Sequence, residues 1–496
     1  MSRAEGVIEA ITARGALVDG VWGTGLAGGT YRHHDPATGR PQADIELAGA
    51  ADVDRAVAAA RAALPSWLEL APDARARLLF RLADLLEANA DHAAVVGALE
   101  NGTPVGGLGP ALYAAQWVRY YAGWVDKIHG EVVPTYPTVG LDYIRQEPYG
   151  VVALLVPWNG PMAGMGQKAA AALAAGNTVV AKAPELAPFG AYEFGALAVE
   201  AGFPPGVLNV IAGGPEAGEA LVRHPGIDKV SLTGGAVAGR RVLAAAADTL
   251  KPVALELGGK SANIIFEDAD LDQAIPMAAS LGVVVLSGQG CALPTRVYVH
   301  DAVYDRVVEG IVAAVAATTV GDPLDPTTAM GPVITEQACE RILATIDEAK
   351  SSGAGTLLHG GSRLGGDLAD GYFVEPTVFG DVDQGSDLAR NEIFGPVLSV
   401  LRFHDDAEVV AKANDSDLGL AAYVHTRDAQ RAIQVAHALE VGYVNVNGFA
   451  AMSPTAPFGG YKASGSGREG GRAGLEEYLR TKNVFIGLGG SFAVNR

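Results

Sequence analysis

Cys291 is the residue of this chain whose type and setting best suit covalent chemistry. It is one of only 2 cysteines and stands in Gly288-Gln289-Gly290-Cys291, directly after the apolar run 281–286. This pattern predicts a glycine-flanked turn with an exposed thiol. Free cysteines are more often buried as small hydrophobic residues, and Cys339, in the predicted helix 335–350, keeps that interpretation. Cys291 differs because other segments supply the base, the oxyanion donor and the nucleotide site that a reactive thiolate would need.

Residues 149–259 carry the elements that must position these groups. We expect strands at 151–156, 178–183, 207–212, 229–233 and 253–256, and helices at 162–175, 189–201 and 237–250. The helices end at Gly176, at Gly202 and before Pro252, which are common stop signals. This alternation predicts a parallel sheet covered on both faces. Ligands of such sheets bind beyond the carboxyl ends of the strands.

The residues that follow these strands are distinctive. They are Pro157-Trp158-Asn159-Gly160-Pro161, Lys182-Ala183-Pro184-Glu185, the glycine-rich stretch 234–239 and Glu256-Leu257-Gly258-Gly259-Lys260. Stretch 234–239 opens a helix, where unpaired N–H groups and the helix dipole favour a phosphate. Lys182 and Glu185 suit ribose hydroxyls, and a carboxylate there favours an unphosphorylated ribose. The pattern therefore predicts a nucleotide site that prefers NAD to NADP.

Two observations separate this site from a standard dinucleotide fold. Gly465-Ser466-Gly467-Arg468-Glu469-Gly470 fits the G-x-G-x-x-G pattern, but it follows a loop and opens no βαβ unit. We interpret it as a glycine-rich loop. The fingerprint is also missing after the first strand, 151–156, so NAD would bind in a variant manner.

Composition and charge exclude several classes of protein. The chain has 496 residues, of which 49% are hydrophobic and 19% charged, which indicates a globular protein with two or three domains. Its formal charge of -20 leaves no basic face for a nucleic acid or an anionic membrane. The N-terminus lacks an apolar signal core, and no apolar run approaches the roughly 18 residues of a membrane span, so we expect a cytoplasmic protein. The cysteines cannot form a disulfide framework, and no metal-ligand cluster is present.

Several segments along nearly the whole chain form a recognisable series. They are Pro157-Trp158-Asn159, Lys182 with Glu185, 234–239, Leu255-Glu256-Leu257-Gly258-Gly259-Lys260, 288–291 with Arg296, Glu392-Ile393-Phe394-Gly395-Pro396, 442–447, and Pro457-Phe458-Gly459-Gly460 through Gly467-Arg468-Glu469. In this order they resemble the NAD(P)-dependent aldehyde dehydrogenase superfamily. The resemblance implies oxidation of an aldehyde to the carboxylic acid with reduction of NAD, and leaves NADP possible.

The resemblance implies catalytic roles that the chemistry of the residues supports. Cys291 would be the nucleophile, forming a thiohemiacetal and, after hydride transfer, a thioester. The Asn159 amide and the backbone N–H of Cys291 would stabilise the oxyanion, although an asparagine between prolines is also a turn former. Glu256 would activate the water that hydrolyses the thioester. Its alternative role is an ion pair with Lys251 or Lys260.

The resemblance also implies a proton path and a set of cofactor residues. Lys168 and Glu469 resemble positions linked to proton movement between the site and solvent. The implied cofactor residues are Val156, Pro157, Trp158, Lys182, Glu185, Gly234, Gly235, Gly239, Leu257, Glu392 and Phe394. Glu392 and Phe394 would hold the nicotinamide ribose and ring, whereas Phe394 without its motif would be interpreted as a core residue.

The chain departs from the family pattern at positions that bear on its ligands. Gly235 replaces a serine that commonly contacts the pyrophosphate, so phosphate contacts there would come from backbone N–H groups only, and Asn391 replaces a frequent glutamate. Gly160 and Gly164 stand where many relatives carry bulky side chains, and would line the substrate tunnel with Phe449. We therefore expect a wide tunnel that accepts bulky, mainly apolar aldehydes, aromatic or terpenoid-like, better than acetaldehyde.

The predicted fold is α/β, with two open parallel-sheet domains and a β-hairpin arm. The domains are a variant Rossmann cofactor-binding domain (1–126 and 148–259), a catalytic domain (260–457), an oligomerisation arm (127–147 and 481–496) and a return segment on the cofactor-binding domain (458–480). The catalytic domain should contain helices 303–316 and 335–350 and strands 297–300, 397–403 and 443–446. The arm should contain a hairpin at 132–146 and a strand at 481–487. Exposed strands need a partner, and the resemblance implies a homodimer or homotetramer.

Other activities stay open for the same residues. A cofactor-independent thiol esterase or hydrolase would use Cys291 and Glu256 but leave Lys182, Glu185 and Glu392 without a role. A CoA-acylating aldehyde dehydrogenase would not need Glu256. A non-catalytic binding protein would have no reason to combine a thiol, an amide and a carboxylate in this way.

Overall fold

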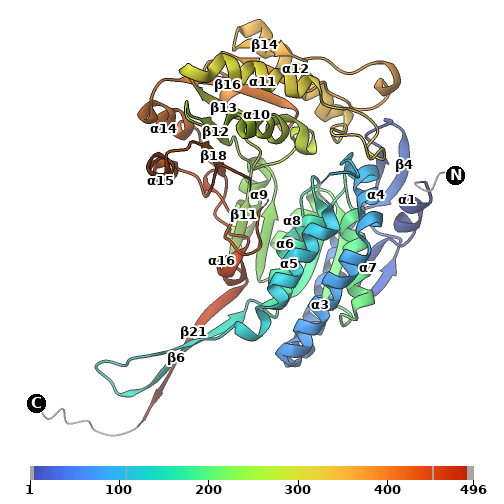
Figure 1. The fold of residues 1–496 in the computed structure, drawn as a ribbon. Helices are drawn as coiled ribbons and strands as arrows, with labels where there is room; N and C mark the ends of the chain where they lie inside the picture. The colour runs from blue at the N-terminus through green and yellow to red at the C-terminus, as the bar shows by residue number, and fades with distance from the viewer. Residues whose placement is uncertain (1–4, 108, 450–451, 489–496) are drawn as a thin grey trace, which may run out of the picture.

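The structure, a computed structural model, describes residues 5–107, 109–449 and 452–488. Two α/β bodies lie one above the other, and a long β-arm projects from the lower one (Figure 1). Each body is built around a seven-stranded sheet with mainly parallel pairing. The predicted α/β class with two parallel-sheet units is confirmed.

The sheet of the first body has the strand order β11-β10-β7-β8-β9-β1-β2. Its strands are β1 (Ala16–Val18), β2 (Val21–Gly23), β7 (Val151–Leu155), β8 (Thr178–Pro184), β9 (Leu208–Gly213), β10 (Lys229–Thr233) and β11 (Val253–Glu256). All the strands predicted between residues 149 and 259 are present, with ends shifted by about one residue at most. On β7, Val152 and Leu154 enter one buried apolar cluster and Val151 and Ala153 another. The sheet is therefore covered on both faces, as predicted.

Helices cover the first sheet. They are α1 (Glu5–Thr12), α2 (Ala50–Glu69), α3 (Pro72–Ala88), α4 (Ala90–Asn101), α5 (Pro110–Ala122), α6 (Pro161–Ala174), α7 (Phe189–Ala201), α8 (Pro215–Arg223) and α9 (Ala236–Ala247). The predicted helices correspond to α6, α7 and α9, whereas α2 to α5 and α8 were not predicted. α5 and α6 pack very closely, because a Cβ added at Gly166 would lie 2.6 Å from the Cα of Ala114. This contact sets one wall of the site described below.

The sheet of the second body has the order β14-β15-β16-β13-β12-β18-β19. Its strands are β12 (Ala262–Ile265), β13 (Arg296–His300), β14 (Thr356–His359), β15 (Thr377–Gly380), β16 (Val397–Phe403), β18 (Ala421–His425) and β19 (Tyr443–Val446). Its helices are α10 (Leu271–Ala279), α11 (Tyr304–Ala316), α12 (Glu336–Ser352), α13 (Asp387–Arg390), α14 (Asp406–Asn414) and α15 (Ala429–Ala438). The strands and helices predicted in this region are found. The domain boundaries stay a prediction.

One helical segment is longer and more apolar than the sequence analysis expected. From α10 helical turns continue to Val284, and the segment Leu271–Gly288 passes the length and composition test for a membrane span. The expectation that no apolar run approaches this length is therefore wrong. Of this segment 50% is buried inside the protein. Ala274 and Val283 belong to a core cluster of the second body, which is the usual position of an apolar core helix.

The arm is a three-stranded antiparallel sheet. It consists of β5 (Glu131–Val133), β6 (Gly140–Pro148) and β21 (Leu479–Gly487), in the order β21-β6-β5. β21 pairs with β6 along its whole length, from Leu479 opposite Pro148 to Gly487 opposite Gly140. The predicted hairpin and late strand are both present and belong to one sheet. Residues 489–496 of the predicted arm lie outside the described residues.

Smaller elements complete the chain. They are the hairpin β3 (Thr30–His34) and β4 (Pro41–Glu46), the pair β17 (Leu418–Gly419) and β20 (Tyr461–Lys462), and α16 (Gly471–Glu476). The chain between β20 and β21 returns to the first body, where α16 packs against α6. The glycine-rich stretch 465–470 is an irregular loop, as interpreted from the sequence. A Cβ at Gly465 would lie 2.1 Å from the carbonyl oxygen of Leu255, so glycine allows the loop to lie directly against β11.

Candidate active site

Cys291 follows a left-handed stretch of backbone. Leu286 and Ser287 have φ values of 52° and 53°, and Gly288 has a φ of 71°. Residues other than glycine rarely adopt this region. The sequence analysis expected a simple glycine-flanked turn, but only Gly288 in this run has the residue type that the conformation favours.

Hydrogen bonds from neighbouring segments hold this loop. Ser287 Oγ donates to the carbonyl of Gly331 at 2.8 Å. The carboxamide of Gln289 accepts from the N–H of Ile334 at 3.0 Å and donates to the carbonyl of Leu286 at 3.2 Å. These bonds support the strained backbone and fix the position of the thiol five residues after Leu286.

The thiol of Cys291 is less exposed than the sequence analysis expected. The side chain is only partly exposed. Burial raises the pKa of the Cys291 thiol to about 12, and the carboxylates of Glu392, Glu256 and Glu469 add to the rise. Lost hydration and nearby negative charge both disfavour a thiolate. The proton therefore stays on sulfur at neutral pH until a base removes it.

Cys291 lines a mainly apolar cavity of about 180 Å³. α4 contributes Gly97, α5 contributes Tyr113 and α6 contributes Met162. Asn159, in the loop between β7 and α6, lines the same cavity. The structure thus brings together the predicted nucleophile and the predicted amide donor in a space large enough for a small organic molecule.

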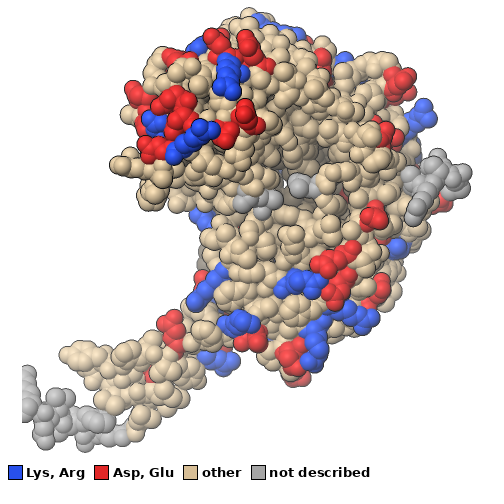
Figure 2. All heavy atoms as spheres, viewed as in Figure 1, with Lys and Arg blue, Asp and Glu red and all other residues tan. Residues whose placement is uncertain are grey.

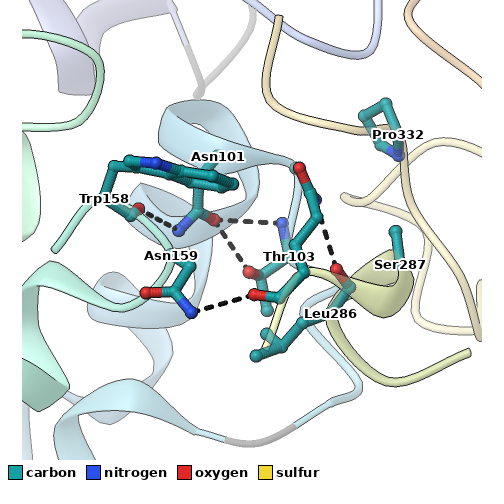
Figure 3. Close-up of a pocket in the computed structure, with 9 residues that line it drawn as sticks. Asn101, Thr103, Trp158, Asn159, Leu286, Ser287 and Pro332 are labelled. Atoms are coloured by element: carbon teal, nitrogen blue, oxygen red, sulfur yellow. Dashed lines mark hydrogen bonds between the residues drawn. The ribbon is translucent and has the colours of Figure 1, made fainter. Parts of the chain in front are cut away.

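The amide of Asn159 points to the loop of Cys291 (Figure 3). Its Nδ2 donates to the carbonyl of Gln289 at 2.8 Å, across 130 positions of the sequence. Asn101 lies behind it, with Nδ2 donating to the carbonyl of Trp158 at 3.2 Å and Oδ1 accepting from the hydroxyl of Thr103 at 2.8 Å. Asn159 is therefore more than a turn former, because its side chain joins the two bodies beside the thiol.

Glu256 lies near Cys291 but does not line its cavity. Its carboxyl is buried and has no hydrogen-bond partner among the described residues. A Cβ at Gly467 would lie 3.0 Å from Glu256 Oε1, so the carboxyl faces the loop at 465–470. Burial and the charge of Glu469 raise the pKa of Glu256 well above its usual value, and Lys168 opposes the rise.

Lys168 and Glu469 form a buried ion pair beside Glu256. Lys168 Nζ lies 2.6 Å from Glu469 Oε1 and donates to Ser231 Oγ at 2.9 Å. The alternative of an ion pair between Glu256 and Lys251 is not seen, because Lys251 Nζ donates to the carbonyl of His224 at 2.7 Å. The two residues linked by resemblance to proton movement thus lie next to the predicted base.

A second cavity, of about 730 Å³, lies over the carboxyl ends of the strands in the first sheet. Val156, Lys182, Glu185 and Gly235 line it, together with residues of α8 and α9. A Cβ at Gly235 would meet nothing within 4 Å, so the start of α9 is open to a ligand. A carboxylate, an ammonium group and an open helix N-terminus fit a nucleotide.

Lys182 is bonded within this cavity rather than free. Its Nζ donates to the carbonyl of Gly213. Burial lowers the pKa of Lys182, while the charge of Glu185 opposes this change. Both groups line the cavity that the sequence analysis predicted for the adenosine ribose.

Glu392 and Phe394 line neither cavity. Gly259 N–H donates to Glu392 Oε1 at 3.0 Å, and burial raises the pKa of this carboxyl. A Cβ at Gly258 would lie 2.1 Å from Glu392 Oε2, which explains the glycine. Phe394, with a φ of 53°, meets the ring of Trp158 edge-on at a centroid distance of 5.4 Å.

The other predicted cofactor residues occupy different positions. Pro157 lines the cavity of Cys291 rather than the 730 Å³ cavity. Gly234 N–H donates to the carbonyl of Glu256 at 3.0 Å. A Cβ at Gly239 would lie 2.8 Å from Leu257 Cδ1, so these two residues pack α9 against the chain after β11.

The predicted tunnel glycines differ in position. Gly160 lines the cavity of Cys291. Gly164 does not, because a Cβ there would point to Pro157 Cδ and Val156 Cγ1, both 3.1 Å away; its predicted place in the lining is wrong. Phe449 also lies outside the lining and packs on Tyr423 at a ring distance of 6.3 Å.

Sequence reasoning missed most residues that line this cavity. Tyr113, Met162, Gln167 and Leu286 belong to it. Gln167 Nε2 donates to the hydroxyl of Tyr113 at 3.0 Å. Apolar and amide side chains on alanine-rich helices carry no pattern that separates a cavity from a core. For Leu286 the apolar run before Cys291 gave no sign of a left-handed backbone.

Comparison with known proteins identifies the family of this chain. The family model described as the aldehyde dehydrogenase family matches residues 22–484. The chain belongs to the aldehyde dehydrogenase family. Members of this family oxidise aldehydes to carboxylic acids, and the resemblance inferred from the motifs is confirmed.

Individual relatives and solved structures support the assignment over the full length. An aldehyde dehydrogenase of Alternaria alternata is 44% identical over 96% of this chain and 95% of its own. Human retinal dehydrogenase 2 is 42% identical over 95% of this chain and 91% of its own. The structure of a Bacillus cereus aldehyde dehydrogenase in complex with NAD+ has 40% identity and a TM-score of 0.93, covering 97% of this chain and 98% of that chain.

Proposed function

We propose that this aldehyde dehydrogenase oxidises bulky, mainly apolar aldehydes to the acids with NAD, through covalent catalysis by Cys291. The observation that carries the proposal is the shared cavity of Cys291 and Asn159, because a nucleophile and an oxyanion donor then meet one carbonyl group. The apolar lining supports an apolar substrate.

In the first step Cys291 attacks the aldehyde carbon. The sulfur forms a bond to this carbon, and the carbonyl electrons move to oxygen. The Asn159 amide and the backbone N–H of Cys291 stabilise the oxyanion. Because the thiol pKa is raised to about 12, a base such as Glu256 or water must take the proton as the bond forms.

Residues of this chain would hold NAD beside the thiohemiacetal. Lys182 and Glu185 suit the adenosine ribose, the open start of α9 at Gly235 suits the pyrophosphate, and Glu392 with Phe394 suits the nicotinamide end. When bound, NAD supplies the acceptor for the hydride that leaves the substrate carbon. The carboxylate of Glu185 favours NAD over NADP, which stays a possible second cofactor.

Glu256 then acts as the base that activates water for hydrolysis of the thioester. Its carboxyl faces Gly467 in this structure, so it has to turn about its side-chain bonds toward Cys291. Lys168 and Glu469 are the adjacent ion pair and would carry the proton away. Water adds to the acyl carbon, Glu256 takes its proton, and the thiolate leaves.

The substrate class follows from the cavity and from one relative. Gly160 adds no side chain to the lining, and a small aldehyde would leave apolar surface unfilled. The human relative at 42% identity is a retinal dehydrogenase, whose name specifies a large apolar aldehyde.

The deciding experiment is an aldehyde panel assayed by nicotinamide reduction with each cofactor. We expect kcat/KM to rise from acetaldehyde to aromatic and terpenoid-like aldehydes, and NAD to be used better than NADP. A series that rises toward short aldehydes would overturn the substrate class. Ester hydrolysis without any cofactor reduction would favour a thiol esterase, and a thioester product with CoA would favour a CoA-acylating enzyme.

We also propose that the arm joins copies of this chain into a homodimer or homotetramer in the cytoplasm. Val132 is 75% exposed and Tyr136 is 95% exposed. On the face shown in Figure 2 most of the arm is free of charged side chains. Apolar strand edges of this kind need cover, and a reactive thiol survives best in a reducing compartment. Sedimentation of the wild type and of Tyr136→Glu tests the assembly, and cell fractionation tests the location.

A further inference from the structure

A third, small cavity, drawn in Figure 3, shares lining residues with the cavity of Cys291. Its volume is about 10 Å³, against about 180 Å³ for the cavity of Cys291. The residues that line both are Asn101, Thr103, Asn159 and Leu286. Ser287 and Pro332 line only the small cavity. The four shared residues therefore form a partition between two spaces.

Leu286 is the apolar member of this partition. The other three side chains are tied by hydrogen bonds: Asn101 Oδ1 accepts from Thr103 Oγ1 at 2.8 Å, and Asn159 Nδ2 donates to the carbonyl of Gln289 at 2.8 Å. The isobutyl group of Leu286 can make no such bond, so removing it opens the partition without leaving a polar group unpaired.

The backbone of Leu286 is what holds its side chain in the partition. Its φ and ψ are 52° and 25°, a region that glycine and asparagine adopt more readily than leucine. The Leu286 carbonyl accepts from the backbone N–H of Gln289 at 2.9 Å and from its side chain at 3.2 Å. The chain thus keeps a leucine at a position whose backbone favours other residues.

We propose that Leu286 is a specificity-determining residue whose side chain excludes aldehydes branched at the carbon next to the carbonyl. This inference rests on the proposed function, in which Asn159 binds the carbonyl oxygen. Because Asn159 belongs to the same partition as Leu286, this partition lies beside the aldehyde carbonyl. A substituent next to the carbonyl meets Leu286, whereas an unbranched chain extends along the larger cavity.

The test compares two isomers, 2-phenylpropanal and 3-phenylpropanal, which differ only in where the ring is attached. In Leu286→Gly, kcat/KM for the branched isomer relative to the linear one should rise about tenfold over wild type. Leu286→Asn keeps a side chain of similar length on a relaxed backbone and should leave this ratio within about twofold. Val105→Ala is the matched control, because Val105 lines only the larger cavity, and should also leave the ratio unchanged.

An unchanged ratio in folded Leu286→Gly overturns the proposal, and so does an equal rise in Leu286→Asn, since the backbone would then be the cause. If Leu286→Gly does not fold, Leu286→Ala decides, with a rise of at least about threefold expected. Labelling of Cys291 by 2-bromopropanamide relative to bromoacetamide, followed by mass spectrometry, needs no dehydrogenase activity. If wild type oxidises no aldehyde, the proposed function fails, and the labelling ratio of Leu286→Gly still decides on the partition.

Discussion

The 730 Å³ cavity and the cavity of Cys291 are built in different ways. The 730 Å³ cavity lies over the ends of neighbouring strands in one parallel sheet, whereas the cavity of Cys291 is lined by helices α4 to α6 and a left-handed loop. Strand ends meet at one edge because the sheet fixes their register. Helix faces and loops meet only after tertiary packing. The strand-end residues of the first cavity, Val156, Lys182 and Glu185, were therefore predictable, whereas most of the helical lining of both cavities was not.

The largest expected effect is the loss of kcat when Cys291 is replaced. Cys291→Ala removes the sulfur that bonds to the substrate in the proposed mechanism, so kcat should fall by about 10⁴-fold or more. NAD binding, measured by titration calorimetry, should stay within about threefold of wild type because the other cavity is untouched. Retained turnover in this variant would show that Cys291 is not the nucleophile, so that the two cavities do not divide catalysis and cofactor binding as proposed.

Asn159→Ala tests whether the amide beside the thiol acts on the oxyanion. We expect kcat to fall by about 10² to 10³-fold, the usual effect of losing one oxyanion donor. Asn101→Ala is the matched control, since Asn101 bonds to the adjacent carbonyl of Trp158, and its loss of kcat should be smaller than that of Asn159→Ala. Steady-state kinetics with one aromatic aldehyde compares the two. An equal loss in both would assign Asn159 a structural role only.

The raised thiol pKa of about 12 predicts the pH dependence of Cys291 labelling. Below that pKa the thiolate fraction grows about tenfold per pH unit, so alkylation by iodoacetamide should rise about a hundredfold from pH 7 to pH 9 in the enzyme without cofactor. Stopped samples analysed by mass spectrometry give the rate. A plateau near pH 8 would mean that the site stabilises the thiolate, contrary to the burial described here.

In the 730 Å³ cavity, Glu185→Ser should change the preference between NAD and NADP. Removing the carboxylate that repels a 2′-phosphate should improve kcat/KM for NADP relative to NAD by about tenfold. Glu219→Ser is the matched control, because Glu219 lines the same cavity and is paired with Arg223 at 2.9 Å. Assays with both nucleotides measure the ratio. An equal change in the control would point to the charge of the whole cavity rather than to Glu185.

The smallest expected effect is a change in the free energy of unfolding, caused by a substitution in the left-handed loop before Cys291. Leu286→Asn places a residue that tolerates positive φ at a left-handed position and should raise the free energy of unfolding by about 1 kcal/mol. Leu250→Asn is the control, because Leu250 has the same φ of 52° but is 90% exposed. Urea unfolding measures both. A gain in Leu250→Asn alone would show that the packing of Leu286 outweighs its backbone strain.

The sequence predicted functional residues best where they directly follow strands. β7, β8, β10 and β11 were predicted with their following residues, because β-rich runs and helix stop signals set both the strand and its end. The direction in which each position faces was not predictable: the Glu256 carboxyl lies against Gly467, and a Cβ at Gly164 would point to Val156. A one-dimensional pattern gives the residue and its element, but the rotamer and the neighbouring segment decide which cavity it lines.

The helices of the first 126 residues show the same limit, because their composition predicts helix but not the packing partner. α2 to α5 are rich in alanine and leucine, which indicates helices without saying what they cover. Tyr113 on α5 reaches the cavity only because Gly166 allows α6 to approach Ala114. Only the packed structure relates a glycine in one helix to a tyrosine in another.

The return of the chain to the first body has a consequence for synthesis. β11, which carries Glu256, receives its edge contacts from the loop at 465–470, where Gly467 N–H donates to the carbonyl of Leu255 at 2.9 Å. Glu469, the partner of Lys168, belongs to the same late stretch. The segment that carries Cys291 is therefore synthesised before the stretch that supplies the partner of Lys168. In the proposed mechanism, newly made enzyme gains its full chemistry only when Glu469 has emerged from the ribosome.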